Sequence, residues 1–192
     1  MSSKSDLTKQ RIVLAANQLF YSKGFSQTSF TDVVAEADVP RGNIYYYFKS
    51  KEEILKAVIR YRLDTISGML AEWDRTIREP QKRLERFVRI MYDSTPALLR
   101  SGCPMGSLAM EFAKGGQELR EQAKMLFDIF QRWLANQFSD LGYADESHDL
   151  SLQLLARGQG LIVVSQVYQD AGFLERGTQE LNRWIDELAR YA

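Results

Sequence analysis

Apolar residues recur at helical spacing along nearly the whole chain, and no segment alternates apolar and polar residues as a half-buried strand would. This periodicity predicts an all-α protein, with about nine helices in 192 residues. One helix is expected between Pro80 and the stretch RSGCP. The helices after it are expected at about 105–113, 118–138, 148–169 and 173–190.

The first 50 residues are divided by helix-ending and helix-starting signals. Gly24 follows an apolar stripe and is expected to end the first helix. Ser29 stands three residues before Asp32, a capping-box pattern that opens a short second helix. Pro40 suits the first turn of a third helix, expected at 41–48. A medium helix and two short ones form the helix-turn-helix arrangement, although any small three-helix unit shows the same spacing.

A long helix follows, opened by a second capping-box pattern at Ser50 and Glu53. We expect the domain boundary inside this helix, around residues 50–60, which gives a domain of residues 1–52 and a domain of residues 53–192. A helix shared between the two would couple them mechanically.

Three consecutive tyrosines, Tyr45 to Tyr47, stand in the third predicted helix. Neighbouring side chains on a helix point about 100° apart, so the three rings cannot all face one core. Ile44 and Phe48 lie four residues apart and are expected to face inward. Tyr45 and Tyr46 then lie nearer the outer face, while Tyr47 can pack inward.

The outer face of this helix carries side chains that can bind DNA. Arg41 can read guanine and Asn43 can read adenine, each with two hydrogen bonds. Gly42 lets the backbone approach a phosphate or a thymine methyl group, and tyrosine hydroxyls donate to phosphates. Lys51, in the first turn of the next helix, can hold a phosphate together with free backbone N–H groups.

The stretch AANQLFYSKGFSQTSFTDVVAEADVPRGNIYYYFKSKEEIL carries a resemblance. Residues 8–56 resemble the DNA-binding domain of the TetR family of bacterial repressors, through Gly24-Phe25, Thr28-Ser29, the Ala37–Val39 turn and the block YYYFKSKEE. Two positions depart from the family pattern. Pro40 replaces a small N-capping hydroxyl residue, and Tyr47 stands where histidine is frequent. The resemblance implies an all-helical ligand-binding domain, a homodimer and these DNA-binding residues: Thr28, Ser29, Arg41, Gly42, Asn43, Tyr45, Tyr46, Tyr47 and Lys51.

The second half is rich in aromatic residues and methionines. Each is most simply a core residue, but together they suit an apolar pocket with adaptable walls. The candidate ligand-binding residues are Met69, Trp73, Met91, Tyr92, Cys103, Met105, Phe112, Phe127, Phe130 and Trp133.

The last two helices are candidates for a four-helix dimer interface. The segment LQLLARGQGLIVVSQVY is apolar on more than one face, and its Gly-x-Gly is no dinucleotide loop because no strand precedes it. The candidate interface residues are Leu154, Gly158, Leu161, Ile162, Val167, Leu181, Trp184, Ile185 and Leu188.

Cys103 is the single cysteine and stands between Gly102, which is expected to end a helix, and Pro104, which can open the next. A thiol at a helix N-terminus is activated by unpaired N–H groups, so Cys103 is a candidate sensor of electrophiles. A small buried hydrophobic residue is the alternative. The glycine–cysteine pair resembles a branch of TetR-family regulators that respond to electrophiles or to unsaturated or planar aromatic compounds.

Other classes of function have less support. One histidine, His148, and one distant cysteine do not form a metal site or a nucleophile–base pair, so no cofactor, metal or catalytic residue is expected. No apolar run is long enough for a membrane span, and without a signal peptide a cytoplasmic protein is expected. Net charge is zero, but residues 1–64 carry ten basic and seven acidic residues, the sign that suits a polyanion.

The sequence therefore predicts a ligand-responsive DNA-binding regulator. We expect a repressor that a small apolar or electrophilic inducer releases from an inverted-repeat operator. Its expected partners are double-stranded DNA, a second copy of the chain and the inducer. An enzyme and a helical protein-interaction module are the rival classes.

Overall fold

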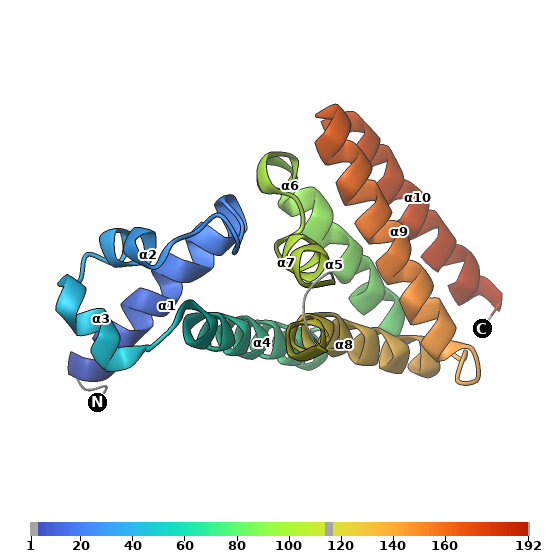
Figure 1. Cartoon of the computed structure of the whole chain (residues 1–192). Coiled ribbons are helices and arrows are strands. Elements are labelled where there is room, and N and C mark those ends of the chain that lie inside the picture. The colour runs from blue at the N-terminus through green and yellow to red at the C-terminus, as the bar shows by residue number, and fades with distance from the viewer. Residues whose placement is uncertain (1–3, 114–116, 192) are drawn as a thin grey trace. The chain divides into compact units, whose positions relative to one another are not determined.

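The computed structural model describes residues 4–113 and 117–191, and within these ranges the chain forms ten helices and no strand (Figure 1). The side chains of Lys4, Arg41 and Ala113 are outside the description. The helices are α1 (Lys4–Ser22), α2 (Phe30–Glu36), α3 (Arg41–Tyr47), α4 (Lys51–Thr76), α5 (Pro80–Asp93), α6 (Thr95–Ser101), α7 (Pro104–Ala113), α8 (Gln117–Asp140), α9 (Ser147–Tyr168) and α10 (Ala171–Tyr191). The all-α prediction is confirmed.

Residues 80–101 form two helices where one was expected, which raises the number in the described ranges to ten. Pro96 explains the break at Ser94, because a proline has no N–H to donate to the carbonyl four residues earlier. That carbonyl belongs to Tyr92, and it accepts instead from the Thr95 hydroxyl at 2.8 Å.

The helices gather into two compact units that do not follow chain order. Unit 1 contains residues 1–65 and 107–126, and unit 2 contains residues 66–106 and 127–192, as far as these are described. Helices α4, α7 and α8 each contribute residues to both units. Contacts define these units, whereas sequence motifs defined the predicted domains, so the division at residue 52 stays a prediction.

The core of unit 1 is formed by α1 together with the short helices and the first half of α4. Its fully buried residues include Ile12, Ala16, Val33, Ile44, Ile54, Leu55 and Val58. Figure 1 shows α1, α2 and α3 in the blue to cyan part of the chain. Because α2 and α3 are too short to be stable alone, this apolar packing must fix their positions.

The core of unit 2 is a single apolar cluster drawn from α4, α5, α6, α8, α9 and α10. Helix α10 packs against α5 and α9, and α6 packs against α9. Two aromatic pairs meet edge to face, Trp73 with Trp133 and Phe87 with Phe130. None of the described helices is long and apolar enough to cross a membrane.

Candidate nucleic-acid interface

Apolar side chains on the inner face of helix α3 pack into the core of unit 1. Ile44 and Phe48 are buried, as the spacing predicted. Pro40 is the N-cap residue of α3 and supplies no side-chain hydrogen bond, although its carbonyl accepts from the Asn43 N–H at 2.8 Å. Apolar packing on one side therefore has to replace the missing cap in orienting α3.

The outer face of α3 is exposed. Gly42 and Asn43 lie at the surface, and the side chains of Tyr45 and Tyr46 are 51% and 75% exposed. The Tyr45 ring stacks on Phe30 of α2, while Tyr47 is half-buried with its ring edge-on to Tyr46. Four of the predicted DNA-binding residues thus share one accessible surface. A fifth, Arg41, has its side chain outside the description.

Gly42 has no reason within the fold to be glycine. It lies in α3, and a Cβ added there would meet no atom within 4 Å. Glycine inside a helix costs about 1 kcal/mol relative to alanine. Gly68 of α4 and Gly160 of α9 are equally open, so the space at Gly42 is accessible to a partner without identifying one.

The segment before α2 holds two further predicted DNA-binding residues. Thr28 is 1% exposed, and its hydroxyl donates to the Gly24 carbonyl at 2.7 Å. Its side chain therefore supports the loop and is not exposed for contact with DNA. Ser29 is exposed and caps α2.

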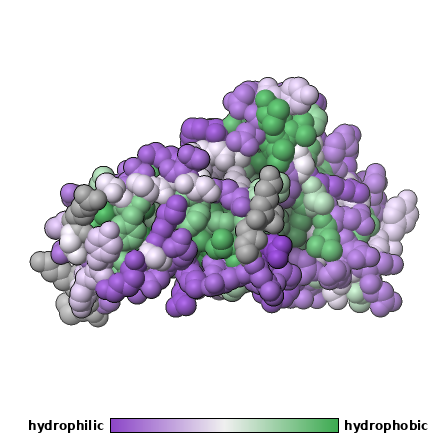
Figure 2. All heavy atoms as spheres, viewed as in Figure 1, coloured by the Kyte–Doolittle hydropathy of each residue, from purple (hydrophilic) through white to green (hydrophobic). Residues whose placement is uncertain are grey.

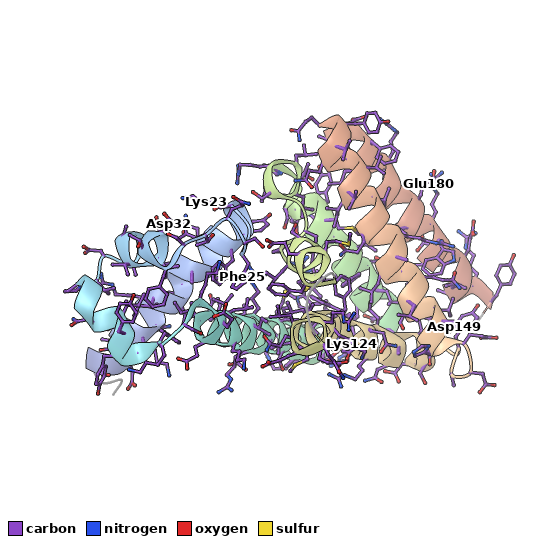
Figure 3. All side chains as sticks on the ribbon, viewed as in Figure 1. Lys23, Phe25, Asp32, Lys124, Asp149 and Glu180 are labelled. Carbon is purple, nitrogen blue, oxygen red and sulfur yellow. The ribbon has the colours of Figure 1, made fainter. Side chains whose placement is uncertain are left out.

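The predicted capping box of α2 is present. The Ser29 hydroxyl accepts from the Asp32 N–H, and the Asp32 carboxylate accepts from the Ser29 N–H at 2.8 Å. This backbone hydrogen bond, with help from the Ser29 hydroxyl, lowers the pKa of Asp32. Figure 3 labels Asp32 on α2, and Phe25 and Lys23 beside the end of α1.

Lys51, predicted to hold a phosphate, is half-buried and bound to the protein itself. Its ammonium donates to the carbonyls of Phe25 and Thr28 at 2.9 and 3.0 Å and lies 4.3 Å from the centre of the Phe25 ring. Two of its three donors are occupied, which leaves one for a phosphate.

Arg11 was missed by the sequence reasoning. From α1 its guanidinium donates to the carbonyls of Ala37 and Asp38 at 2.7 and 2.8 Å. These two residues form the turn between α2 and α3, where Asp38 has a left-handed φ of 48°. No local motif marks such a contact, because the donor and the acceptors are 26 and 27 residues apart.

The candidate ligand-binding residues are distributed over both units. Trp73, Met91, Cys103, Phe130 and Trp133 lie together in the core cluster of unit 2, and Met69 and Met105 pack against it half-buried. Phe127 is also half-buried in unit 2.

Two of those candidates lie elsewhere. Phe112 belongs to unit 1, where its ring meets Phe25 edge-on with the ring centres 5.3 Å apart. Tyr92 is exposed and borders a shallow groove between α5 and α10.

Cys103 is 8% exposed, and the Gln159 side-chain amide donates to its sulfur at 3.3 Å. Gly106, one turn later, leaves room for the same side chain, because an added Cβ would lie 2.4 Å from Gln159 Oε1. A polar amide and a thiol therefore meet at the edge of an apolar core.

Several predicted dimer-interface residues are already buried within the single chain. Leu154, Ile162, Leu181 and Ile185 belong to the core of unit 2, and Gly158 is buried where α9 passes Met91 of α5. They therefore hold unit 2 together and leave little surface for a partner, although Leu181 also lines the groove described next.

A different face of α9 and α10 is exposed and carries apolar residues among charged ones. Leu161 and Trp184, both predicted, line an open groove with Val164 and Phe173, and the predicted Leu188 is half-buried. The predicted Val167 is 72% exposed. Figure 2 shows hydrophobic residues at the surface where α9 ends and α10 begins.

His148 is exposed and lies 3.3 Å from the Asp149 carboxylate at the start of α9. Among residues 4–113 and 117–191, no group of three histidine, cysteine or acidic side chains is placed to hold a metal ion.

Comparison with known proteins decides the family. Residues 12–58 match the bacterial regulatory proteins of the tetR family, and residues 65–180 match the C-terminal domain of LmrA/YxaF-like transcriptional regulators. The second match alone covers more than half of the chain. The chain belongs to the TetR family. It is thus a DNA-binding transcriptional regulator of the helix-turn-helix type and not an enzyme.

Individual TetR-family relatives match over most of the chain. A helix-turn-helix-type transcriptional regulator in the lacX 3' region of Lactococcus lactis is 29% identical over 176 residues, which is 88% of each chain. The transcriptional repressor DhaR of a Mycobacterium species is 27% identical over 66% of this chain and 61% of its own. A TetR transcriptional regulator from Legionella pneumophila has a crystal structure with a TM-score of 0.82, 25% identity and 97% coverage of both chains.

Proposed function

We propose that this regulator is a repressor that binds an inverted-repeat operator as a homodimer and is released by a small ligand. The observation that carries the proposal is the outer face of α3. Asn43, Tyr45 and Tyr46 are exposed beside a glycine that the fold does not require. Such a face fits the major groove, with Asn43 on a base and tyrosine hydroxyls on phosphates.

A homodimer is supported by the open groove between α9 and α10. Val164, Phe173 and Trp184 line this groove together with charged residues such as Arg157 and Glu180, and a surface with exposed apolar groups among charged ones suits association. Two copies of the pair α9–α10 would form a four-helix interface. A two-fold dimer places one α3 on each of two half-sites, which explains the expectation of an inverted repeat.

Repression is supported by the name of the relative DhaR, a transcriptional repressor. A ligand response is supported by the core of unit 2, in which large aromatic side chains and the single cysteine belong to one buried cluster. The burial of Cys103 and its contact with Gln159 favour an apolar ligand with one polar group over an electrophile that needs an open thiol.

Coupling between ligand and DNA is proposed to run through α4. This helix begins at Lys51, beside the loop before α2, and continues without interruption into unit 2. A ligand that binds the DNA-free form better will shift the population toward release, and DNA must then weaken ligand binding by the same factor.

The experiment begins with selection of duplexes from a randomised library by the purified protein. The selected duplex is then placed upstream of a reporter gene, and reporter expression is measured with and without the regulator. Lower expression with the regulator, restored by a compound from a library of planar aromatic molecules, supports the proposal. Higher expression with the regulator would mean activation, and no enriched duplex would remove the operator from the proposal.

A further inference from the structure

Glu111 on α7 binds the loop that follows α1. Its carboxylate oxygens accept hydrogen bonds from the backbone N–H of Phe25 at 2.8 Å and of Ser26 at 2.9 Å. All three residues belong to unit 1. Each oxygen takes one N–H, so a single side chain satisfies two neighbouring backbone donors of the loop.

Gly24 is adapted to this contact in two ways. Its φ of 87° lies in the left-handed region that side chains disfavour. In addition, an added Cβ would lie 3.3 Å from one Glu111 oxygen and 3.4 Å from the other. The glycine thus turns the chain and also leaves space for the carboxylate.

The loop is held from its carbonyl side as well. Lys51 donates to the carbonyls of Phe25 and Thr28, and the Thr28 hydroxyl donates to the carbonyl of Gly24. The N–H of Phe25 therefore meets an anion while its carbonyl meets a cation. The Phe25 ring packs edge-on against Phe20 and Phe112, which lies next to Glu111 in the sequence.

Glu111 connects the loop after α1 to a helix that begins in unit 2. The residue lies 86 positions after Phe25, beyond the helix-turn-helix segment. It stands in α7, which begins at Pro104, directly after Cys103, and the first three residues of α7 belong to unit 2. Seven residues of helix span about 10 Å, so a displacement at the start of α7 reaches Glu111 through a rigid element.

We propose that Glu111 is a positioning residue for DNA binding, and that its bonds to Phe25 and Ser26, here called the Glu111 latch, hold the loop that orients α2 and α3. The latched loop presents α3 in the form that binds DNA, and movement of α7 opens the latch and weakens binding. This inference rests on the proposed function, because it assigns a regulator to the same DNA-binding surface.

Charge and geometry predict opposite changes in DNA affinity for a variant that removes the Glu111 carboxylate. DNA is a polyanion, so removing a negative charge from unit 1 should by itself strengthen binding. The latch predicts the opposite for Glu111→Gln. Glutamine replaces one of the two oxygens with an NH2 donor, so in the same pose one of the two N–H groups faces a donor and loses its bond.

Two further variants separate charge from geometry. Glu111→Asp keeps the charge but shortens the side chain by one C–C bond, about 1.5 Å, so it cannot reach both N–H groups. Glu118→Gln removes the same charge from α8 in unit 1, where Glu118 pairs with exposed Lys56 and binds no backbone group in the contacts described.

The measurement combines hydrogen exchange with DNA titration. Exchange of a peptide covering residues 23–29 is followed by mass spectrometry for wild type and the three variants. Affinity is measured for the duplex that wild type selects and for a shuffled duplex. We expect amide exchange in this peptide to be at least about tenfold faster in Glu111→Gln and Glu111→Asp, because each variant loses a charge-assisted hydrogen bond. We also expect both variants to bind the selected duplex about tenfold more weakly than wild type does. Glu118→Gln should match wild type within about twofold in exchange and should bind the selected duplex as tightly as wild type or more tightly.

Three other results would contradict the positioning role of Glu111 or the proposed function. General destabilisation would speed exchange in α9 and α10 as well, and uniform acceleration in the Glu111 variants would overturn the positioning role. Unchanged or tighter binding of the selected duplex by Glu111→Gln would also overturn it. If wild type itself does not distinguish the selected from the shuffled duplex, the proposed function fails, whereas the exchange measurement still shows whether the latch exists.

Discussion

The ammonium of Lys51 lies 2.9 Å from the carbonyl oxygen of Phe25 and 4.3 Å from the centre of its aromatic ring. A residue that the sequence assigned to DNA phosphate thus also supports the loop before α2. The two roles differ in their salt dependence, because only a phosphate contact releases counterions from DNA.

Lys51→Met should lower the free energy of unfolding by about 1–3 kcal/mol, since it removes a charged donor from two half-buried carbonyls. If loop support is its main role, the slope of log affinity against log salt stays at the wild-type value. A slope reduced by about one would instead assign Lys51 to phosphate. Lys49→Met is the comparison variant, because Lys49 is exposed just after α3 and its ammonium donates to a single carbonyl, that of Tyr45.

Asn43→Ala should reduce affinity for the selected duplex by about 1–3 kcal/mol and relax base preference at one position of each half-site. Tyr46→Phe keeps the exposed ring and removes only the hydroxyl, so it should weaken binding to all duplexes to a similar extent. Titration against a set of single-base variants of the duplex measures both effects. An Asn43→Ala protein with unchanged base preference would contradict direct readout by this side chain.

Asp38 adopts a left-handed conformation in the turn between α2 and α3. Asp38→Val places a branched side chain at this φ and should lower the free energy of unfolding by about 1–2 kcal/mol. Asp38→Gly relieves the strain and should stay within about 0.5 kcal/mol of wild type. Urea denaturation gives both values, and equal losses in the two variants would mean that the side chain, not the backbone, determines the turn.

Val164→Glu replaces an apolar side chain of the groove between α9 and α10, which already contains Arg157 and Glu180, with a carboxylate that a dimer would have to bury, and should weaken the dimer. Met125→Glu changes an exposed apolar residue of unit 1 in the same way and should leave the dimer intact. Sedimentation velocity distinguishes the two species. A dimeric Val164→Glu protein with an unchanged dissociation constant would move the interface away from this groove.

Cys103 should react slowly with a maleimide in the native protein and at least about 100-fold faster after unfolding in guanidinium, because a buried thiol is accessible only through opening. Intact-mass spectrometry follows the labelling. Rapid, complete labelling of the native protein would contradict the buried role and favour an electrophilic inducer. In that case Cys103→Ser should keep DNA binding and lose the response.

Features with local causes could be predicted from the sequence. The capping box of Ser29 and Asp32 is set by four consecutive residues, and the inward position of Ile44 and Phe48 follows from helical spacing alone. The accessible Tyr46 ring follows from the same geometry.

Features that depend on distant partners could not be predicted. The contacts of Arg11 with the α2–α3 turn and of Glu111 with Phe25 join residues far apart in the chain. The dimer candidates illustrate a different problem. Because α9 is apolar on more than one face, periodicity cannot distinguish Ile162, which is buried in unit 2, from Val164, which lines the open groove.

We propose that the outer face of α3 gives this regulator sequence-specific binding to DNA. Fluorescence anisotropy titration of the wild-type protein at about 150 mM salt, with the selected duplex and a shuffled duplex of equal length and composition, measures this specificity. We expect at least about 10³-fold tighter binding of the selected duplex. Equal affinities for the two duplexes would contradict it.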